Sequence, residues 1–316
     1  MRFAFIVLHF RDSAMSERCV ASVTRCADPQ DTVIVVDNSH DFSPVTVKPL
    51  VVRPPDFNPG FAAGMNAGAK EAQKRECDIL VFVNNDTMLE ENFRTEVASA
   101  FVDSGEGLAA VGPKVVFSGN PEIVQTAGGY ISPRRMGCVH TGTMQPATSI
   151  RGRFETTFIS GCVIAVRSSA FTHIGGWSEA YFFGGEDMEL SLRLTRSGYR
   201  LAICADTTVF HDAKMEDGSG SSHSYHEPFF FANLWLNRIL FASRNFTPFE
   251  NFRFRVFLFM YFLVMLPVRL PQIGAESGYF KKLSACTRSA TRLPFIRKIK
   301  SVDRELVERL AKEISR

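Results

Sequence analysis

The apolar run from Ile79 to Val83 constrains the fold of this chain more than any other feature. Five apolar residues in succession are typical of a strand that is buried on both faces of a parallel sheet. The run ends abruptly at Asn84, Asn85 and Asp86. Because open α/β sheets bind ligands at the carboxyl ends of their strands, we expect these oxygen-bearing side chains to border a ligand. A polar turn without a ligand would have the same composition.

The first hundred residues alternate between strand and helix patterns. Strands that are separated by helices indicate βαβ units with right-handed crossovers. The sequence therefore predicts an α/β fold with a mostly parallel central sheet flanked by helices. In this part, strands are predicted at 3–8, 32–36, 50–53 and 79–83, and helices at 16–26 and 61–75. Beyond it we expect irregular strands and loops at 109–153, strands at 157–166 and 207–210, and helices at 168–174 and 186–197.

The cysteine pattern and the composition limit the class of protein. Seven cysteines are scattered without a Cys-x-x-Cys pair, which argues against a disulfide framework or a zinc site and favours a reducing compartment. The hydrophobic content of 45% and the charged content of 22% are those of a folded globular chain. The basic and long apolar segments of a signal peptide are not found at the start, so no such peptide is expected.

Residues 229–316 differ in charge from the rest of the chain. They contain 16 Lys and Arg against 6 Asp and Glu, whereas residues 1–228 contain 20 and 27. This asymmetry indicates an anionic partner, either a membrane or a nucleic acid. The apolar run 256–268 favours an anionic membrane surface and argues against nucleic acid.

The run 256–268 is too short to cross a membrane as a helix. Thirteen residues span roughly 20 Å, against roughly 30 Å for a hydrocarbon core. The run would therefore lie in the membrane interface or form a buried core helix. A charged helix is expected at 301–314. We predict two regions, a domain at 1–228 and a helical, membrane-associating appendage at 229–316.

A glycine-rich segment precedes and opens the predicted helix 61–75. Gly60, Gly64 and Gly68 are spaced four residues apart, and the small residues would let the backbone approach a ligand closely. The start of a helix also favours an anionic group. The spacing is neither the dinucleotide fingerprint nor a P-loop. Close packing of the helix against the sheet would explain the glycines equally well.

Further candidate residues stand at strand ends and at the start of a helix. Asp37 follows the strand 32–36, where an acid either accepts a hydrogen bond from a nucleotide or serves as a turn residue. Glu186 and Asp187 begin a helix, where a carboxylate either acts as a general base or stabilises the helix dipole. His211 ends a strand and is either a metal ligand or a structural histidine.

A metal site is expected after the strand 79–83. Hard oxygen ligands such as the Asp86 carboxylate suit Mg²⁺ or Mn²⁺. Such an ion usually shares its coordination sphere with the phosphates of a substrate. The sequence therefore predicts a site for a metal and a diphosphate.

Taken in chain order, these motifs resemble those of the family 2 glycosyltransferases, which have a GT-A fold. The resemblance extends from about Phe3 to His211, and the bacterial rhamnosyltransferase-like enzymes of surface polysaccharide assembly are the most similar subgroup. It implies an inverting, metal-dependent transfer from a nucleotide-diphosphate sugar. The matching segments are VVDNS, NPGFAAGMNAG, FVNNDT and SGCVIAVRSSAFTHIGGWSEAYFFGGEDMELSLRLTRSGY, followed by a strand that ends in histidine.

The resemblance also implies roles for individual residues. Asp187 would be the catalytic base, with Glu186 beside it binding the acceptor. Asp86 would be the main ligand of Mg²⁺ or Mn²⁺, and His211 a further one. The usual D-x-D motif reads Asn-Asn-Asp here, so metal binding would depend on these two residues and the diphosphate itself. The residues expected to contact the nucleotide or its sugar are His9, Asp37, Asn58, Gly60, Asn66, Asn84 and Asn85.

The expected donor is a dTDP- or UDP-sugar, with rhamnose as the sugar suggested by the subgroup. Galactofuranose and other hexoses remain open, because the sugar contacts fall in the stretch 109–153. The expected acceptor is a glycan or a polyprenyl-diphosphate-linked glycan. The enzyme would act as a peripheral protein at the cytoplasmic face of the inner membrane.

Two other function classes are open to the same residues. A nucleotidyltransferase would need a glycine-rich basic loop after the first strand, where His9, Phe10, Arg11 and Asp12 stand instead. A non-catalytic, membrane-docked nucleotide-sugar-binding protein would not need the acidic pair that begins the helix 186–197. The intact pair favours an enzyme.

Overall fold

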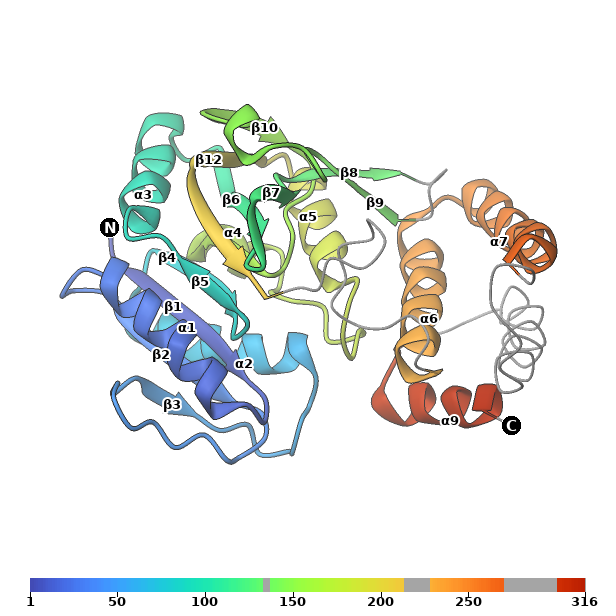
Figure 1. The fold of residues 1–316 in the computed structure, drawn as a ribbon, viewed down its shortest axis with the longest axis horizontal. Coiled ribbons are helices and arrows are strands. Elements are labelled where there is room, and N and C mark those ends of the chain that lie inside the picture. The colour runs from blue at the N-terminus through green and yellow to red at the C-terminus, as the bar shows by residue number, and fades with distance from the viewer. Residues whose placement is uncertain (133–136, 213–227, 270–299, 316) are drawn as a thin grey trace. The chain divides into compact units, whose positions relative to one another are not determined.

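The computed structural model describes residues 1–132, 137–212, 228–269 and 300–315 (Figure 1). These residues form two compact units. The first consists of 1–131, 138–179 and 186–212, and the second of 132, 137, 180–185, 228–269 and 300–315. Elements of the first unit up to β6 are β1 (Phe3–His9), α1 (Ser13–Cys26), β2 (Thr32–Asp37), β3 (Leu50–Val52), α2 (Phe61–Lys74), β4 (Ile79–Asn84), β5 (Thr87–Leu89), α3 (Phe93–Ser104) and β6 (Leu108–Phe117).

The elements after β6 include short strands, the last strands of the sheet and the C-terminal helices. Before β11 they are β7 (Asn120–Thr126), β8 (Gly129–Ser132), β9 (Gly137–His140), a 3₁₀ helix (Ala147–Ser149) and β10 (Arg153–Thr156). They continue with β11 (Val163–Arg167), α4 (Ser168–His173), α5 (Glu186–Arg196) and β12 (Arg200–His211). The second unit contains the helices α6 (Pro228–Asn245), α7 (Pro248–Arg269) and α9 (Arg304–Ser315).

The central sheet is mixed, which corrects the prediction of a mostly parallel sheet. Its strand order is β10-β12-β6-β11-β4-β1-β2-β3, with β5 beside β12 and β7 beside β6. The strands β3, β2, β1 and β4 are parallel, as are β12 and β6. However, β11 runs antiparallel to both β4 and β6. An apolar run shows that a strand is buried on both faces, but it carries no information on strand direction.

The direction of β11 has a consequence for the position of its first residues. The backbone N–H of Asn84, at the end of β4, donates to the carbonyl oxygen of Cys162 at 2.8 Å. The chain therefore enters β11 at the edge of the sheet where β4 ends. Residues 160–162 come to lie at the edge where the sequence predicts a ligand.

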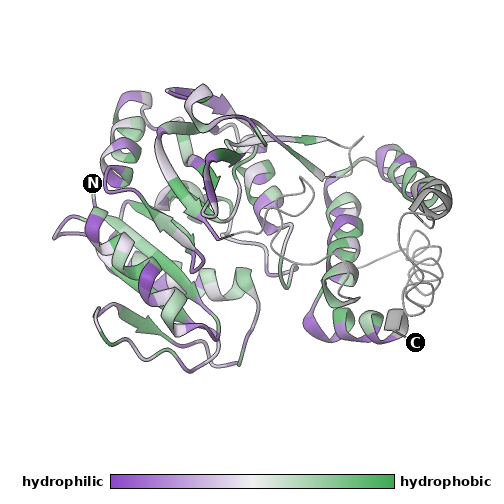
Figure 2. Ribbon diagram, in the orientation of Figure 1, coloured by the Kyte–Doolittle hydropathy of each residue, from purple (hydrophilic) through white to green (hydrophobic). Residues whose placement is uncertain are grey.

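Helices cover both faces of the β1–β4 part of the sheet. Phe3, Phe5 and Val7 of β1 face a core that they share with apolar residues of α1 and α3. The alternate residues Ile6 and Leu8 lie against α2. Figure 2 shows the strands of this sheet largely in green, in agreement with their burial on both faces.

Close packing accounts for two of the three glycines of α2 and its start. A methyl group on Gly68 would lie 2.4 Å from Ile6 Cγ2 and 2.8 Å from Val36 Cγ2, and one on Gly64 would lie 2.7 Å from Leu8 Cδ1. Such distances are shorter than van der Waals contact, so α2 reaches the sheet only with glycine at these positions.

We expect Gly68→Ala to destabilise the protein, because the added methyl group forces α2 away from β1 and β2. Overpacking of this kind typically costs about 1–3 kcal/mol of unfolding free energy. Urea denaturation followed by circular dichroism measures the loss. Gly119→Ala is the matched control, since a methyl group there meets no atom within 4 Å. Equal stability of the two variants would contradict the packing argument.

Three features of the sheet region differ from the prediction. The stretch 109–153 contains β6, a strand of 10 residues that is buried along its whole length, although Gly112 and Pro113 suggest a loop. The predicted strand 157–166 forms only from Val163, because its first residues lead into the sheet. The helix α3 and the short strand β5 were not predicted.

The second unit is helical. Within it α6 packs against α7 and α9, and Phe254 and Leu258 of α7 are buried. None of the helices in the described parts of the chain combines the length and the apolar character needed to cross a membrane. The run 256–268 lies inside α7. Among residues 248–260 of this helix, for which side-chain exposure is described, the exposed large apolar residues are Phe249, Phe252, Val256, Phe257 and Met260.

Candidate functional site

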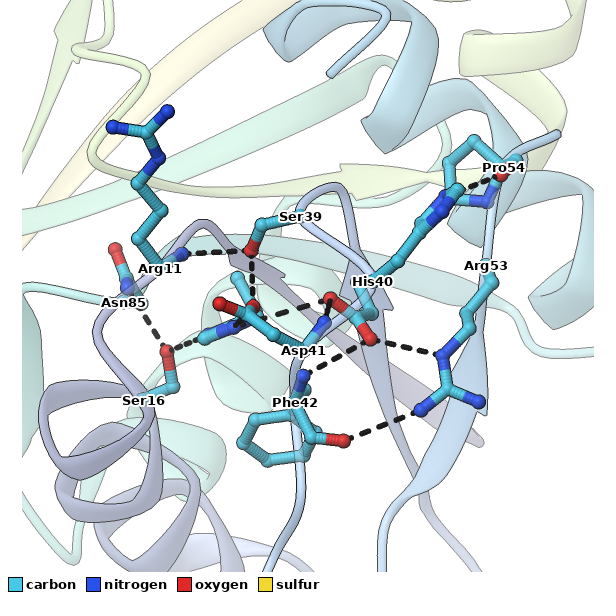
Figure 3. A network of polar contacts seen from close by, with 11 residues as sticks. Arg11, Ser16, Ser39, His40, Asp41, Phe42, Arg53, Pro54 and Asn85 are labelled. Atoms are coloured by element: carbon cyan, nitrogen blue, oxygen red, sulfur yellow. Dashed lines mark hydrogen bonds and ion pairs between the residues drawn. The ribbon is translucent and has the colours of Figure 1, made fainter. Parts of the chain in front are cut away.

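Asp37 stands at the end of β2 and organises the turn that follows. Its carboxylate is fully buried, yet both oxygens have donors. Oδ2 accepts hydrogen bonds from Arg53 Nε at 2.9 Å and from the backbone N–H of Phe42 at 3.1 Å, and Oδ1 accepts one from the N–H of Asp41 at 3.3 Å (Figure 3). A buried carboxylate that is paired with a guanidinium and two N–H groups is well satisfied. The predicted contact between Asp37 and a nucleotide stays a prediction.

A second chain of polar contacts joins the ends of β1, β2 and β4. Because β1 and β2 are parallel, His9 lies opposite Asp37 at the same sheet edge. His9 Nδ1 lies 2.7 Å from Ser16 Oγ, and His9 Nε2 lies 2.9 Å from Asp41 Oδ1. Ser16 Oγ also accepts a hydrogen bond from Asn85 Nδ2 at 2.9 Å (Figure 3). The predicted residues His9, Asp37 and Asn85 are therefore brought together.

His9, Asp37 and Asp41 also satisfy the distance requirement for a metal site. A ring nitrogen and two carboxylate oxygens lie within 4.8 Å of one another. However, these atoms already have protein partners, and the Arg53 guanidinium beside Asp37 opposes a second cation. Hydrogen bonds from Ser39 and His9 lower the pKa of the Asp41 carboxyl, as expected for an acceptor in a hydrogen-bond network. The geometry favours a hydrogen-bond network over a metal centre.

The side chains of Asp86, which follows β4, and His211, at the end of β12, lie close together. β5 pairs with β12 so that Thr87 lies opposite His211, and the N–H of Asp212 donates to the Asp86 carbonyl oxygen at 2.8 Å. His211 Nε2 lies 3.3 Å from Asp86 Oδ2, and His211 Nδ1 lies 2.8 Å from Gln125 Oε1. The predicted metal ligands are therefore neighbours.

The chemistry of this pair fits a divalent cation. Asp86 Oδ1 is buried and has no hydrogen-bond partner among the described residues. A buried oxygen without a partner is costly, and a cation would satisfy it. Carboxylate oxygen and imidazole nitrogen are both ligands that Mn²⁺ accepts. The other ring nitrogen of His211 is hydrogen-bonded to Gln125, and histidines that bind a metal commonly have such a hydrogen bond.

Asp187 lies at the start of α5 and contacts the residues that lead into β11. Its Oδ2 accepts a hydrogen bond from the N–H of Gly161 at 3.1 Å, and its Oδ1 accepts one from the N–H of Met188 at 2.8 Å. A methyl group on Gly161 would lie 3.1 Å from Asp187 Cβ, so glycine permits this approach. Burial raises the pKa of the Asp187 carboxyl, because the charged form is disfavoured away from water. A carboxylate in this state is a stronger base than an exposed one.

The residues that lead into β11 connect the end of β4 with Asp187. Burial is the main reason why the pKa of the Cys162 thiol rises to about 12, but the negative charges of Asp86 and Asp187 both raise it as well. The N–H of Gly161, the residue before Cys162, donates to Asp187 Oδ2, and Asp86 follows Asn84 by two residues. Cys162 itself is hydrogen-bonded to Asn84 at the end of β4.

The remaining predicted residues have positions of different kinds. Asn58 donates its N–H to the Asn38 carbonyl oxygen at 2.7 Å, and Asn38 Nδ2 donates to the Gly60 carbonyl oxygen at 3.0 Å, which ties their loop to the end of β2. The backbone of Asn84 pairs with β11 and accepts a hydrogen bond from Thr87 Oγ1 at 2.7 Å. Glu186 is buried as the first residue of α5.

Asn66 holds another segment of the chain. Its Nδ2 donates to the Trp177 carbonyl oxygen at 3.0 Å and to Glu179 Oε1 at 2.8 Å, and its Oδ1 accepts from the N–H of Trp177 at 2.9 Å. Its amide is therefore engaged by residues 177–179. A contact between Asn66 and the nucleotide sugar stays a prediction.

Four residues of the site were not identified from the sequence: Ser16, Asp41, Arg53 and Gln125. A signal existed for Arg53, because it is the last residue of the predicted strand 50–53 while Asp37 follows the strand 32–36, and adjacent parallel strands end at one edge. Gln125 carried no such signal, since β7 lies in the stretch that reads as irregular.

Known proteins share both the sequence pattern and the fold. A family model described as glycosyltransferase like family 2 matches residues 1–220. The O-antigen chain rhamnosyltransferase WbaN of Salmonella anatum is 25% identical over 254 residues, which are 77% of this chain and 75% of WbaN.

Solved structures share the fold as well, among them the following two, which have TM-scores above 0.5. The structure of GalNAc-T7 with UDP, GalNAc and Mn²⁺ has a TM-score of 0.52 at 16% identity, over 77% of this chain and 50% of that chain. The mannosyltransferase PcManGT from Pyrobaculum calidifontis, in complex with GDP-Man and Mn²⁺, has a TM-score of 0.51 at 13% identity, over 92% of this chain and 84% of that chain. At these identities the likeness concerns the fold alone.

Proposed function

Because the chain belongs to the glycosyltransferase-like family 2, we propose that it transfers a sugar from a nucleotide-diphosphate sugar to a hydroxyl of a glycan acceptor with inversion of the anomeric carbon. One observation carries this proposal. Gly161 and Cys162, which lead into β11, are hydrogen-bonded to Asp187 and to Asn84, and Asn84 stands two residues before Asp86, whose carboxylate lies 3.3 Å from His211 and has one buried oxygen without a partner among the described residues. These contacts support a cation site and a base at one edge of the sheet, which a single displacement requires.

The residues that would hold Mg²⁺ or Mn²⁺ are Asp86 and His211. A cation bound there would offset the negative charge that develops on the leaving diphosphate. His9, Asp37 and Asn85, together with the loop of Asn58 and Gly60, would hold the nucleotide.

Asp187 is the proposed base. Its carboxylate would take the proton of the acceptor hydroxyl as that oxygen attacks the anomeric carbon from the face opposite the diphosphate, and attack from that face inverts the centre. The hydrogen bonds from Gly161 and Met188 fix the direction of the carboxylate before the reaction. Glu186 would bind the acceptor beside it.

We propose surface polysaccharide synthesis as the biological setting, with a lipid-linked or polysaccharide acceptor. The similarity to WbaN, an O-antigen chain rhamnosyltransferase, supports this setting and makes dTDP- or UDP-linked rhamnose the first donor to test. Another hexose or galactofuranose on the same fold is the alternative.

A panel of nucleotide sugars tests the proposed function directly. The melting temperature is measured with each of them, with and without Mn²⁺. A ligand at 100 times its dissociation constant adds about 2.7 kcal/mol to the stability, which a melting curve detects. We expect one nucleotide sugar to raise the melting temperature in a Mn²⁺-dependent manner. The absence of any such shift across the panel would contradict the proposal.

We also propose that residues 1–228 form the transferase domain and that residues 229–316 bind an anionic membrane surface, at the cytoplasmic face of the inner membrane. On α7, Phe249, Phe252, Val256 and Met260 are exposed at helical spacing, and Arg253 lies over the Phe249 ring at 5.7 Å. Aromatic residues with a basic neighbour are typical of helices in the membrane interface.

The double variant Phe252→Ser/Phe257→Ser is expected to bind vesicles that contain phosphatidylglycerol about tenfold more weakly, because two exposed aromatic side chains no longer enter the interface. Co-sedimentation with vesicles measures the change. The control Val45→Ser/Val102→Ser removes two exposed apolar residues of the first unit and should bind like wild type. Equal binding by both double variants would contradict the membrane proposal.

A further inference from the structure

Two side chains of α5 accept hydrogen bonds from one short segment of the chain. Asp187 Oδ2 accepts the N–H of Gly161 at 3.1 Å, and Ser191 Oγ accepts the N–H of Ile159 at 3.2 Å. Asp187 and Ser191 are four residues apart, so their side chains share one face of the helix. The segment 159–161 is therefore joined to α5 by two hydrogen bonds, one to the proposed base and one to a serine.

The spacing of these two hydrogen bonds agrees with the geometry of both partners. Four residues of an α-helix rise about 6 Å along its axis. Two residues of chain extend over at most about 7 Å. Two N–H groups that are two residues apart in the segment can therefore reach two side chains that are four residues apart on the helix, without distortion of either.

The segment 159–161 lies between β10 and β11 and belongs to neither strand. Its N–H groups at positions 159 and 161 take no part in the pairing of these strands with the central sheet, and α5 accepts both of them. The next residue, Cys162, is hydrogen-bonded to Asn84 at the end of β4. The segment thus connects the proposed base with the edge of the sheet.

Ile159 is held by the sheet as well as by the helix. Its side chain is buried against β6, where a methyl group on Gly112 would lie 2.5 Å from Ile159 Cγ2, so glycine makes room for it. Ser191 is fully buried. A buried N–H group without an acceptor is unfavourable, and the Ser191 hydroxyl supplies the acceptor for that of Ile159.

We propose that Ser191 is a positioning residue for Asp187. By holding Ile159, it keeps the N–H of Gly161 directed at Asp187 Oδ2, so that the carboxylate has one fixed orientation in which its other lone pairs take the proton of the acceptor hydroxyl. Ser191 acts through the segment 159–161 and touches no reacting group. This inference rests on the proposed function.

The test begins with Ser191→Ala, which removes the acceptor of the Ile159 N–H. We expect kcat for transfer to fall about tenfold, because a base that is displaced by a fraction of an ångström is less well aligned with the acceptor hydroxyl. The KM for the donor and the Mn²⁺-dependent thermal shift should not change, since the residues proposed to hold the nucleotide and the cation lie on other elements.

The pH profile of kcat/KM provides a readout that is specific to the Gly161 hydrogen bond. Burial raises the pKa of Asp187, whereas the hydrogen bond from Gly161 and the charge of His140 on β9 lower it. The Cys162 thiol, on which Asp187 also acts, has a pKa of about 12 and stays neutral at acidic pH. The variant keeps His140 and Cys162 but weakens the hydrogen bond, so the acidic limb should move to higher pH.

Two control variants separate a change of position from a loss of stability. Thr195→Ala removes a hydroxyl whose hydrogen bonds stay within α5, to the carbonyl oxygens of Ser191 and Leu192, and it should keep the wild-type kcat and acidic limb. Ser22→Ala removes a buried helix hydroxyl that also accepts a backbone N–H, that of Leu89 at 3.1 Å. It should lower the melting temperature about as much as Ser191→Ala does, but leave the acidic limb in place.

The outcomes separate this inference from the proposed function. A wild-type protein that transfers no sugar would overturn the proposed function before any variant is made. With an active wild type, an unchanged kcat in Ser191→Ala would overturn the positioning role, as would a lower kcat with an unmoved acidic limb or an equal movement of the limb in Ser22→Ala. If Ser191→Ala does not fold, Ser191→Cys, which has nearly the same size but a weaker acceptor, is measured with the same expectations.

Discussion

Asp187→Asn is expected to bind the donor like wild type and to lose nearly all transfer. Asparagine has almost the same shape but cannot take a proton from the acceptor hydroxyl. Loss of a general base lowers the rate by about 10²- to 10⁴-fold. The rate is measured as kcat for transfer, and donor binding by calorimetry with Mn²⁺. Wild-type turnover in this variant would remove Asp187 as the base.

The pH dependence of wild-type transfer gives a second view of the same residue. The base has to be ionised, so kcat/KM falls as the pH is lowered through its pKa. Because burial raises the pKa of Asp187 above 3.8, the acidic limb of the profile should lie at a higher pH than for an exposed aspartate. The matched control is Asp212→Asn, because Asp212 is also an aspartate but is exposed to solvent. This variant should show the same acidic limb as wild type. A profile in which kcat/KM does not fall at any pH above 3.8 would contradict the assignment of Asp187 as the base.

Asp86→Ala is expected to abolish the metal-dependent part of nucleotide binding. The first position of the usual D-x-D motif is neutral here, so removal of Asp86 leaves His211 as the remaining predicted protein ligand. A hydrogen bond or ion contact to a charged group contributes about 1.5–3 kcal/mol, which corresponds to about a 10- to 100-fold weaker affinity in the presence of Mn²⁺. Calorimetric titration with UDP or dTDP, with and without Mn²⁺, measures the difference.

The competing metal site supplies the control. Asp41→Asn changes the cluster of His9, Asp37 and Asp41, which also meets the distance criterion for a metal ion. Its atoms are occupied by hydrogen bonds, so this variant should keep the Mn²⁺ dependence of binding. Loss of that dependence in Asp41→Asn, with no loss in Asp86→Ala, would move the metal to the other cluster.

The pattern of apolar residues and the polar residues at the ends of predicted strands were enough to predict the parts of the site that depend on local sequence. The apolar strands of the first hundred residues lie where they were expected, since burial on both faces requires unbroken apolar runs. Asp86 and His211 are neighbours because β5 and β12 pair. The glycines at positions 64 and 68 proved to serve packing against the sheet.

The parts that could not be predicted depend on contacts between distant segments. The direction of β11 follows from the path of the chain through 85–162, which no local pattern records. Gln125 lies near His211 only because β7 pairs with β6, and β6 contains a glycine and a proline that suggest a loop.

The central claim is a single displacement, assisted by one base, at the edge where β4 ends and β11 begins. The anomeric configuration of the transferred sugar tests it most directly, measured by proton NMR during turnover with the nucleotide sugar that stabilises the protein most. We predict a product whose configuration is inverted relative to the donor. A product that retains the donor configuration would contradict this mechanism.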